Sequence, residues 1–288
     1  MTYAQPTADG SFAIGGDLLV DRLGYGTMRL TGPGIWGEPA DRAGAIRLLR
    51  QVVELGVTLI DTADSYGPFV AENLLREALH PYPAGLLIAT KGGFTRQGPG
   101  QWAPVGRPEY LRQCVEMSLR RLAVDRIDLY QLHRIDPQVP TADQIGVLAD
   151  MRREGKIRHL GLSEVSVAQI EEVRSITTIA TVQNMYSLAR RQSESVLSYC
   201  EDNNLGFIPW APTATGELAQ PGGPLAAAAR RNNCTPAQLA LAWLLRRSPV
   251  MLPIPGTSTM EHLEENLGAN QVELTDDEFA RLRSIPGG

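Results

Sequence analysis

The chain has 288 residues, a hydrophobic content of 43% and a formal net charge of -5 at pH 7. This acidic balance argues against a nucleic-acid surface, which needs clustered Lys and Arg to neutralise phosphates. Apolar runs stay short of the roughly twenty residues that a membrane helix needs, and the first ten residues lack an export signal. The three dispersed cysteines indicate reduced thiols rather than a disulfide framework or a metal cluster. We therefore expect a cytoplasmic protein without metal, folded as one domain over residues 1–288.

Short apolar runs alternate with longer segments of helical periodicity along the chain. Residues 12–14 and 18–20 flank Gly15-Gly16-Asp17, which predicts a β-hairpin ahead of the first repeating unit. Eight strands are predicted after this hairpin, at residues 23–27, 57–61, 86–91, 127–133, 157–163, 179–183, 206–210 and 251–254.

Residues typical of helix N-termini lie between the predicted strands. Asp41 and Pro108 each begin a helical segment, and Thr235 precedes a proline at a first helical position. Residues 166–169 have the form of a capping box, and residues 275–278 predict a second box that opens a terminal helix.

Eight strand and helix units with strands apolar on both faces predict a closed (β/α)8 barrel, a TIM barrel in the α/β class. The initial hairpin is suited to plug its floor, and the terminal helix follows its last unit. An open doubly wound sheet is the competing architecture. The turn at residues 24–29 lacks the third glycine of a dinucleotide-binding fingerprint, so the barrel is favoured.

Two long connections follow predicted strands. Residues 30–40 contain Trp36, and residues 92–107 contain Phe94 and Trp102, in both cases among glycines and prolines. Barrel active sites lie at the carboxyl ends of the strands, where long loops carry binding surfaces. We interpret these aromatic residues as walls of a substrate pocket.

Polar residues end three neighbouring predicted strands. Asp61 ends the second, Lys91 the third and His133 the fourth, while Tyr66 follows Asp61 by five residues. Each has a plain explanation taken singly, such as a turn cap, an exposed amine or a packed histidine. In a barrel, however, the four side chains lie on one rim and converge, so together they predict a catalytic site.

The chemistry open to these side chains is proton donation to a carbonyl group. A free phenol has a pKa near 10, and an adjacent Lys91 ammonium lowers the pKa of Tyr66. Asp61 holds Lys91 charged, and neutral His133 donates a hydrogen bond to the substrate oxygen. Side chains supply no hydride, so a nicotinamide cofactor is required.

These motifs resemble the aldo-keto reductase family. Residues 59–67 are similar to its first signature, residues 89–91 to its lysine motif and residues 129–133 to its histidine strand. The resemblance extends from about Asp21 to the end of the chain. It implies a barrel that reduces an aldehyde or ketone to an alcohol, reversibly, with NADPH, and the tetrad Asp61, Tyr66, Lys91 and His133 with Tyr66 as general acid.

The resemblance also implies a cofactor site. Ser163 and Gln183 correspond to residues that hydrogen-bond the carboxamide, Trp210 to the aromatic that stacks on nicotinamide, and Glu265 and Asn266 to adenine contacts. The implied cofactor-binding residues are Gly26, Thr27, Met28, Asp61, Ser163, Gln183, Trp210, Ala211, Pro212, Ile254, Gly256, Thr257, Ser258, His262, Glu265 and Asn266. The implied substrate-binding residues are Trp36, Tyr66, Phe94, Trp102 and His133.

Two positions depart from the family pattern. Glu164 replaces an asparagine and, when ionised, cannot donate a hydrogen bond to a carboxamide. No strongly basic residue lies near Gly256 or His262 to bind a 2'-phosphate, and residues 213–224 contain no Arg or Lys. His262, Arg230 and Arg231 are candidates to compensate. NADPH is favoured by the resemblance, and NADH stays an alternative.

The stretch at residues 22–34 is similar to a bacterial subgroup that includes pyridoxal reductases, which makes pyridoxal one candidate among small aldehydes. Two other functions stay open. Lys91 suits a Schiff-base aldolase, although that reading leaves Tyr66, Gln183 and Trp210 unexplained. Some relatives with this barrel bind nucleotide as sensor or regulatory subunits with little turnover, and the intact tetrad argues against that role.

Overall fold

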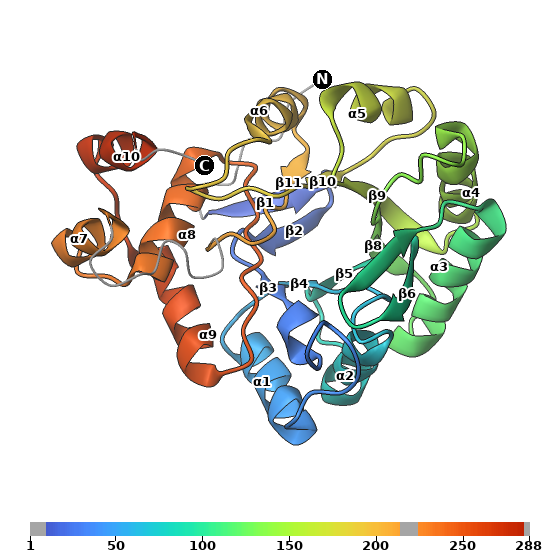
Figure 1. Cartoon of the computed structure of the whole chain (residues 1–288), viewed down its shortest axis with the longest axis horizontal. Helices are drawn as coiled ribbons and strands as arrows, with labels where there is room; N and C mark the ends of the chain where they lie inside the picture. The colour runs from blue at the N-terminus through green and yellow to red at the C-terminus, as the bar shows by residue number, and fades with distance from the viewer. Residues whose placement is uncertain (1–9, 214–223, 285–288) are drawn as a thin grey trace.

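A curled sheet of parallel strands forms the centre of the molecule in the computed structural model, which describes residues 10–213 and 224–284 (Figure 1). Its hydrogen-bonded order is β11-β10-β9-β8-β5-β4-β3. These strands are β3 (Tyr25–Gly26), β4 (Leu59–Asp61), β5 (Leu87–Gly92), β8 (Ile127–Leu132), β9 (Ile157–Ser163), β10 (Thr181–Gln183) and β11 (Gly206–Phe207).

Residues 251–255 close this sheet into a ring. The backbone N–H of Leu252 donates to the carbonyl oxygen of Phe207 of β11 at 2.8 Å, and that of Gly24, beside β3, donates to Pro253 at 2.9 Å. Proline has no N–H, so Pro253 and Pro255 interrupt the ladder and leave isolated bonds where an eighth strand was predicted. The predicted (β/α)8 barrel is confirmed.

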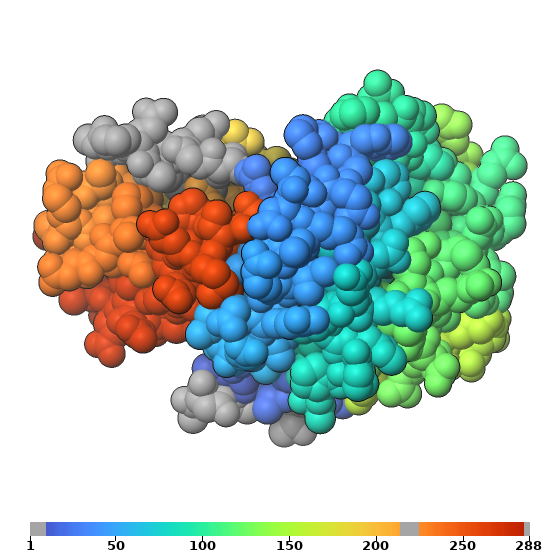
Figure 2. All heavy atoms as spheres, turned by 90° about the horizontal axis from the view of Figure 1, so that it is seen from below, coloured from blue at the N-terminus to red at the C-terminus, as the bar shows by residue number. Residues whose placement is uncertain are grey.

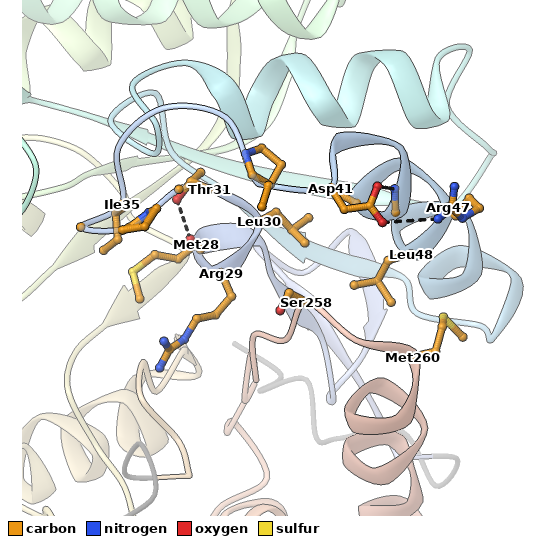
Figure 3. Close-up of a pocket in the computed structure, with 17 residues that line it drawn as sticks. Met28, Arg29, Leu30, Thr31, Ile35, Asp41, Arg47, Leu48, Ser258 and Met260 are labelled. Carbon is orange, nitrogen blue, oxygen red and sulfur yellow. Dashed lines mark hydrogen bonds and ion pairs between the residues drawn. The ribbon is translucent and has the colours of Figure 1, made fainter.

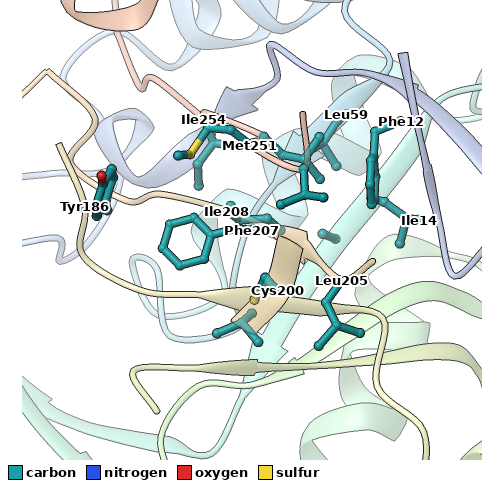
Figure 4. Close-up of a cluster of buried hydrophobic side chains, with 14 of the residues drawn as sticks. Phe12, Ile14, Leu59, Tyr186, Cys200, Leu205, Phe207, Ile208, Met251 and Ile254 are labelled. Atoms are coloured by element: carbon teal, nitrogen blue, oxygen red, sulfur yellow. The ribbon is translucent and has the colours of Figure 1, made fainter. Parts of the chain in front are cut away.

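An amino-terminal hairpin covers one end of the barrel. Strands β1 (Ser11–Ile14) and β2 (Leu18–Asp21) pair antiparallel, as predicted. Phe12 and Ile14 are buried within the main hydrophobic core. Figure 4 shows Phe12 close to Leu59 of β4, in one cluster with Phe207 of β11. Leu59 is the first residue of β4, and a Cβ on Gly206, the first residue of β11, would lie 3.2 Å from Phe12 Cε1. The hairpin therefore packs at the starts of these strands and leaves their carboxyl ends open.

Helices surround the barrel strands (Figure 1). They are α1 (Arg42–Glu54), α2 (Val70–Leu79), α3 (Pro108–Leu122), α4 (Thr141–Arg153), α5 (Val167–Arg174), α6 (Glu194–Asn203), α7 (Pro224–Arg231), α8 (Pro236–Arg247), α9 (Met260–Leu267) and α10 (Asp276–Arg283), with short 3-10 turns η1 (Thr27–Leu30) and η3 (Gly268–Gln271). Figure 2 shows α9 against α1, and Leu263 of α9 packs in one buried cluster with Leu48 and Leu49. Within the described ranges, no helix is both long enough and apolar enough to cross a membrane.

The predicted helix caps are formed with one exception. Asp41 accepts a hydrogen bond from the backbone of Gly44 at 2.7 Å, and the capping box that begins at Ser166 has both of its bonds. Thr275 also caps α10, but the side chain of Glu278 accepts from Arg231 at 2.7 Å instead of completing the predicted terminal box. The ion pair ties α10 to α7.

The connection after β5 is a second hairpin rather than an irregular loop. Strands β6 (Phe94–Gly98) and β7 (Gln101–Pro104) pair antiparallel around Pro99-Gly100. The sequence reading missed it, although Pro-Gly is a turn signal. The backbone N–H of Gly100 donates to the carbonyl oxygen of Gly34 at 2.8 Å, so this hairpin rests on the loop after η1.

Candidate active site

The carboxyl ends of β4, β5 and β8 bring polar side chains to one rim of the barrel. Asp61 is the last residue of β4 and pairs in register with Ala89 of β5. Lys91 pairs with Gln131 of β8, and His133 follows that strand directly. Because neighbouring parallel strands end at the same edge, these side chains share a small volume.

Lys91 is the centre of this group. Its Nζ donates to Asp61 Oδ2 at 2.6 Å, to the carbonyl oxygen of Thr62 at 2.9 Å and to Tyr66 Oη at 3.3 Å. Lys91 is 0% exposed, Asp61 1% and Tyr66 7%. The ring centroids of Tyr66 and His133 lie 6.0 Å apart in an edge-to-face arrangement. The structure therefore brings together all four residues of the predicted tetrad.

Neutral amides hold the other carboxylate oxygen of the ion pair. Asp61 Oδ1 accepts from Gln183 Nε2 at 2.9 Å and from Gln131 Nε2 at 3.2 Å. Gly161 makes room for this network, because a Cβ there would lie 2.9 Å from Gln131 Cγ and 2.3 Å from Thr181 Oγ1. Both oxygens of Asp61 are thus fixed, which orients the Lys91 ammonium.

Burial dominates the electrostatics of the group. It raises the pKa of Tyr66, and the charge of Lys91 opposes this rise without cancelling it. Our expectation that Lys91 lowers the pKa of Tyr66 therefore describes its contribution and not the net result. Burial alone would lower the pKa of Lys91, but Asp61 and Tyr66 together raise it above its usual value. Tyr66 thus holds its proton, and Lys91 is charged, at neutral pH.

His133 is held neutral. Burial, and then the positive charges of Lys91, Arg134 and Arg96, lower the pKa of His133 well below its usual value. Its Nδ1 lies 3.3 Å from the hydroxyl of Ser65. The imidazole is therefore a neutral ring with one hydrogen-bonded nitrogen, as the predicted role of His133 requires.

A cleft of about 540 Å³ lies directly above the group and includes Asp61, Tyr66 and His133 in its lining. The predicted substrate residues Phe94 and Trp102 also line it. Trp36, predicted as a further wall, does not line this cleft, and Ile35 lies there instead. The indole of Trp36 faces the guanidinium of Arg96 at 5.7 Å, outside the lining.

The predicted cofactor residues divide into two sets. Those in the lining of the cleft are Gly26, Met28, Asp61, Ser163, Gln183, Trp210, Ala211, Pro212, Ile254 and Gly256. Those outside it are Thr27, Thr257, Ser258, His262, Glu265 and Asn266. The hydroxyl of Thr27 donates to the carbonyl oxygen of Asp61 at 3.1 Å, so it links β4 to η1. Of the remaining members, Thr257 and Ser258 precede α9, and His262, Glu265 and Asn266 lie within it.

A second cavity of about 650 Å³ adjoins the cleft and shares Met28, Arg29 and Ile35 with it. Figure 3 shows Asp41 and Arg47 on one side of this cavity and these three residues on the other. Ser258 also lines it. Arg29 therefore places a positive charge at the junction of the two spaces, which the sequence reading overlooked.

Arg96 was not singled out from the sequence, and it links the segments that contain the predicted substrate residues Trp36 and Trp102. Its guanidinium donates to the carbonyl oxygens of Ile35 at 2.9 Å, Gly34 at 3.0 Å and Ser65 at 2.6 Å. It also stacks on Trp102, with 3.6 Å between the guanidinium carbon and the ring centroid. One side chain thus joins the loop after η1, the β6–β7 hairpin and the segment before Tyr66.

Glu164, which departs from the expected asparagine, holds the indole of Trp210. Its Oε1 accepts from the indole Nε1 of Trp210 and from the backbone N–H of Met185, both at 2.6 Å. Glu164 itself has a left-handed backbone with a φ of 55°. The carboxylate therefore fixes the angle of the tryptophan that faces the cleft, a function that the sequence pattern does not reveal.

The basic residues suggested for a 2'-phosphate lie elsewhere. Arg231 on α7 is paired with Glu278, and neither Arg230 nor His262 lines either cavity. Residues 214–223, the greater part of the stretch whose lack of Arg and Lys was noted, are outside the described residues.

Comparisons with known proteins show the family of the chain. The model of the aldo/keto reductase family matches residues 22–286. An uncharacterized oxidoreductase of Schizosaccharomyces pombe (C215.11c) is 54% identical over 93% of this chain and 87% of its own length. Pyridoxine 4-dehydrogenase of Escherichia coli is 40% identical over 92% of this chain and 95% of its own length.

A solved structure extends the likeness to the fold. The crystal structure of an aldo-keto reductase from Klebsiella pneumoniae in complex with NADPH has a TM-score of 0.80 at 27% identity, over 94% of this chain and 93% of the other. The barrel, the polar group at its open end and these relatives lead to one conclusion: the chain is an oxidoreductase of the aldo/keto reductase family.

Proposed function

We propose that this protein reduces a small aldehyde or ketone to an alcohol with NADPH, and that Tyr66 supplies the proton. The observation that carries the proposal is the buried contact between Tyr66 Oη and Lys91 Nζ, at 3.3 Å, on the floor of an open cleft. Neutral His133 lies beside the same phenol. A proton donor, the charge that tunes it and a second donor for the carbonyl oxygen are therefore adjacent.

The polar groups in the cleft fit a nicotinamide carboxamide. The hydroxyl oxygen of Ser163 accepts from Arg134 at 3.0 Å, which leaves its O–H free to donate to a carbonyl oxygen. Gln183 uses its Nε2 on Asp61, which leaves its Oε1 to accept from an amide N–H. The indole of Trp210, fixed by Glu164, offers a flat surface for a ring.

A nicotinamide held by these residues would supply the hydride that the carbonyl carbon needs. Tyr66 gives its proton to the carbonyl oxygen, so the two transfers together produce the alcohol. Lys91 stabilises the phenolate that Tyr66 becomes, and Asp61 keeps Lys91 charged. The raised pKa of Tyr66 ensures that the phenol carries a proton when the substrate arrives.

His133 orients the substrate oxygen in this proposal. A hydroxyl proton of Ser65 directed to Nδ1 leaves the ring proton on Nε2, which then donates to the carbonyl oxygen. Neutral imidazole is sufficient because it binds the oxygen without competing with Tyr66 for the role of acid.

The hydrogen bonds of Lys91 disfavour a Schiff-base aldolase. An amine must lose its proton to attack a carbonyl. Lys91 instead has a raised pKa and donates to three oxygens, those of Asp61, Thr62 and Tyr66. Its environment thus stabilises the charged ammonium and not the nucleophile.

The relatives and the charge of Arg29 support a choice of substrate and cofactor. Dehydrogenation of an alcohol such as pyridoxine is the reverse of aldehyde reduction, so we propose pyridoxal as one candidate substrate. We propose NADPH over NADH because the Klebsiella pneumoniae relative binds NADPH and Arg29 provides a cation where the cleft meets the second cavity.

The test is a titration of the purified protein with NADPH and with NADH, followed by tryptophan fluorescence. We expect NADPH to quench the fluorescence at lower concentrations than NADH does. A Trp210→Phe variant reports how much of the signal comes from the tryptophan in the cleft. Loss of NADPH absorbance with benzaldehyde or pyridoxal then measures turnover. Binding without turnover of either aldehyde would support the sensor or regulatory alternative, and absence of binding would refute the proposal.

A further inference from the structure

Arg134 is a cation in the cleft that the proposed reaction does not use. It follows His133 at the end of β8 and lines the cleft together with Tyr66 and Phe94. Its guanidinium carbon lies 5.5 Å from the centroid of the Phe94 ring. Arginine on a protein surface usually extends its head group into water, whereas here the head group is half-buried against the ends of two barrel strands.

Most of the N–H donors of this guanidinium have no hydrogen-bond partner among the described residues. Nη1 donates to the carbonyl oxygen of His133 at 2.6 Å and to the hydroxyl of Ser163 at 3.0 Å. Nε and Nη2 form no hydrogen bond within residues 10–213 and 224–284, and no carboxylate of those residues forms an ion pair with Arg134. Unpaired donors in a partly dry cleft are costly, so an acceptor from the ligand would stabilise them.

Positive charge gathers near the position of the reacting carbonyl. Arg134, Lys91 and Arg96 each contribute to the low pKa of His133. Lys91 is neutralised by Asp61 at 2.6 Å, but the described partners of Arg96 are neutral carbonyl oxygens. In the lining of the cleft itself, Arg29 and Arg134 are the cations and the carboxylate of Asp61 is paired with Lys91, so the described lining is net cationic in a chain whose net charge is -5. Such a wall favours an anion.

We propose that Arg134 binds an anionic oxygen, a carboxylate or an ionised phenol, that the substrate carries close to its reacting carbonyl. The planar fork of a guanidinium suits such an oxygen, and Phe94 and Trp102 suit an attached aromatic ring. The inference rests on the proposed function, because it names the class of carbonyl compound that this site selects.

A purely structural role for Arg134 predicts a different result. Its bonds to His133 and Ser163 also tie β8 to β9. Loss of those bonds alone would slow charged and neutral substrates by the same factor. Loss of an anion contact slows the charged substrate more, so the ratio of two matched substrates separates the roles.

The experiment measures kcat/KM for two matched pairs of substrates with NADPH. Phenylglyoxylate and its methyl ester differ by a carboxylate next to the ketone. Salicylaldehyde and 2-methoxybenzaldehyde, compared at a pH that ionises the salicylaldehyde phenol, differ by an anionic oxygen next to the aldehyde. For each pair we compare the ratio of kcat/KM for the charged substrate to kcat/KM for the neutral one. We expect Arg134→Met to lower this ratio by about ten- to a hundredfold in at least one pair, and that pair identifies the group that Arg134 binds.

Two further variants keep the test independent of folding. Arg134→Lys should restore part of the ratio, because it keeps the charge without the fork. Arg153→Met removes an exposed arginine on α4, whose side chain is 77% exposed, and should leave both ratios unchanged. Equal ratios for the native protein and Arg134→Met in both pairs would overturn the inference.

An equilibrium measurement separates this inference from the proposed function. Salicylate and salicylamide differ by one charge, and their binding is followed by tryptophan fluorescence without turnover. We expect the native protein to prefer salicylate and Arg134→Met to lose that preference. Loss of the preference in Arg134→Met, together with no reduction of benzaldehyde, salicylaldehyde or phenylglyoxylate by the native protein, would refute only the proposed function. Turnover of benzaldehyde with no preference for salicylate in the native protein would refute only the role of Arg134.

Discussion

Removal of Lys91 should destabilise the protein strongly, because it leaves a buried carboxylate without its counter-ion. Asp61 is 1% exposed in the native protein, and in a Lys91→Met variant it would keep only the two amide donors of Gln131 and Gln183. Breaking one side of a buried ion pair costs about 3 to 5 kcal/mol. Methionine fills a similar volume, so the cavity contribution is small. We expect the free energy of unfolding to fall by this amount.

The double variant Asp61→Asn with Lys91→Met provides the control. It removes both charges, so no ion remains unpaired in the barrel. We expect its loss of stability to be smaller than that of Lys91→Met alone, by about 2 kcal/mol or more.

Urea denaturation followed by circular dichroism, without cofactor, measures the loss of stability in the double variant and in each single variant, Lys91→Met and Asp61→Asn. A double variant whose loss equals the sum of the two single losses would refute the reasoning, because it would show that Asp61 and Lys91 do not depend on each other.

Three further predictions test other parts of the site. The pH profile of kcat/KM for reduction should show no break near pH 6.5, because the lowered pKa of His133 keeps its ring neutral there, and such a break would contradict the account. The rate should fall only above the raised pKa of Tyr66, since reduction needs the protonated phenol. Glu164→Ala should weaken NADPH binding about tenfold and shift the fluorescence of Trp210, and an unchanged spectrum would mean that the indole is not held by this carboxylate. Arg96→Met should lower the free energy of unfolding by about 2 kcal/mol and speed proteolysis of the β6–β7 hairpin, with native-like digestion as the contrary outcome.

Sequence was sufficient where one local rule determined the outcome. Alternating apolar runs and helix caps such as Asp41 predicted the order of the barrel units. All parallel strands of a barrel end at the same rim, so Asp61, Lys91 and His133 could be placed together from the sequence alone.

What the sequence did not reveal depends on contacts between distant segments. Arg96 donates to the carbonyl oxygen of Ser65, 31 positions earlier in the chain, and to those of Ile35 and Gly34, 61 and 62 positions earlier. No local sequence pattern encodes such an approach. Glu164 was noticed as a departure, but its bond to Trp210 spans 46 positions. Arg134 stands directly after His133, yet its exposure to the cleft depends on how β8 and β9 end side by side. The net pKa of Tyr66 depends on burial, which a motif does not report.

The most direct test of the central claim is the rate of a single turnover of benzaldehyde by NADPH-loaded Tyr66→Phe. The variant keeps the ring and loses only the hydroxyl that lies 3.3 Å from Lys91 Nζ. We expect NADPH to bind with an unchanged dissociation constant and the chemical step to slow by about 10² to 10⁴-fold, the contribution of a positioned general acid. A single-turnover rate equal to that of the native protein would contradict the assignment of Tyr66 as the proton donor.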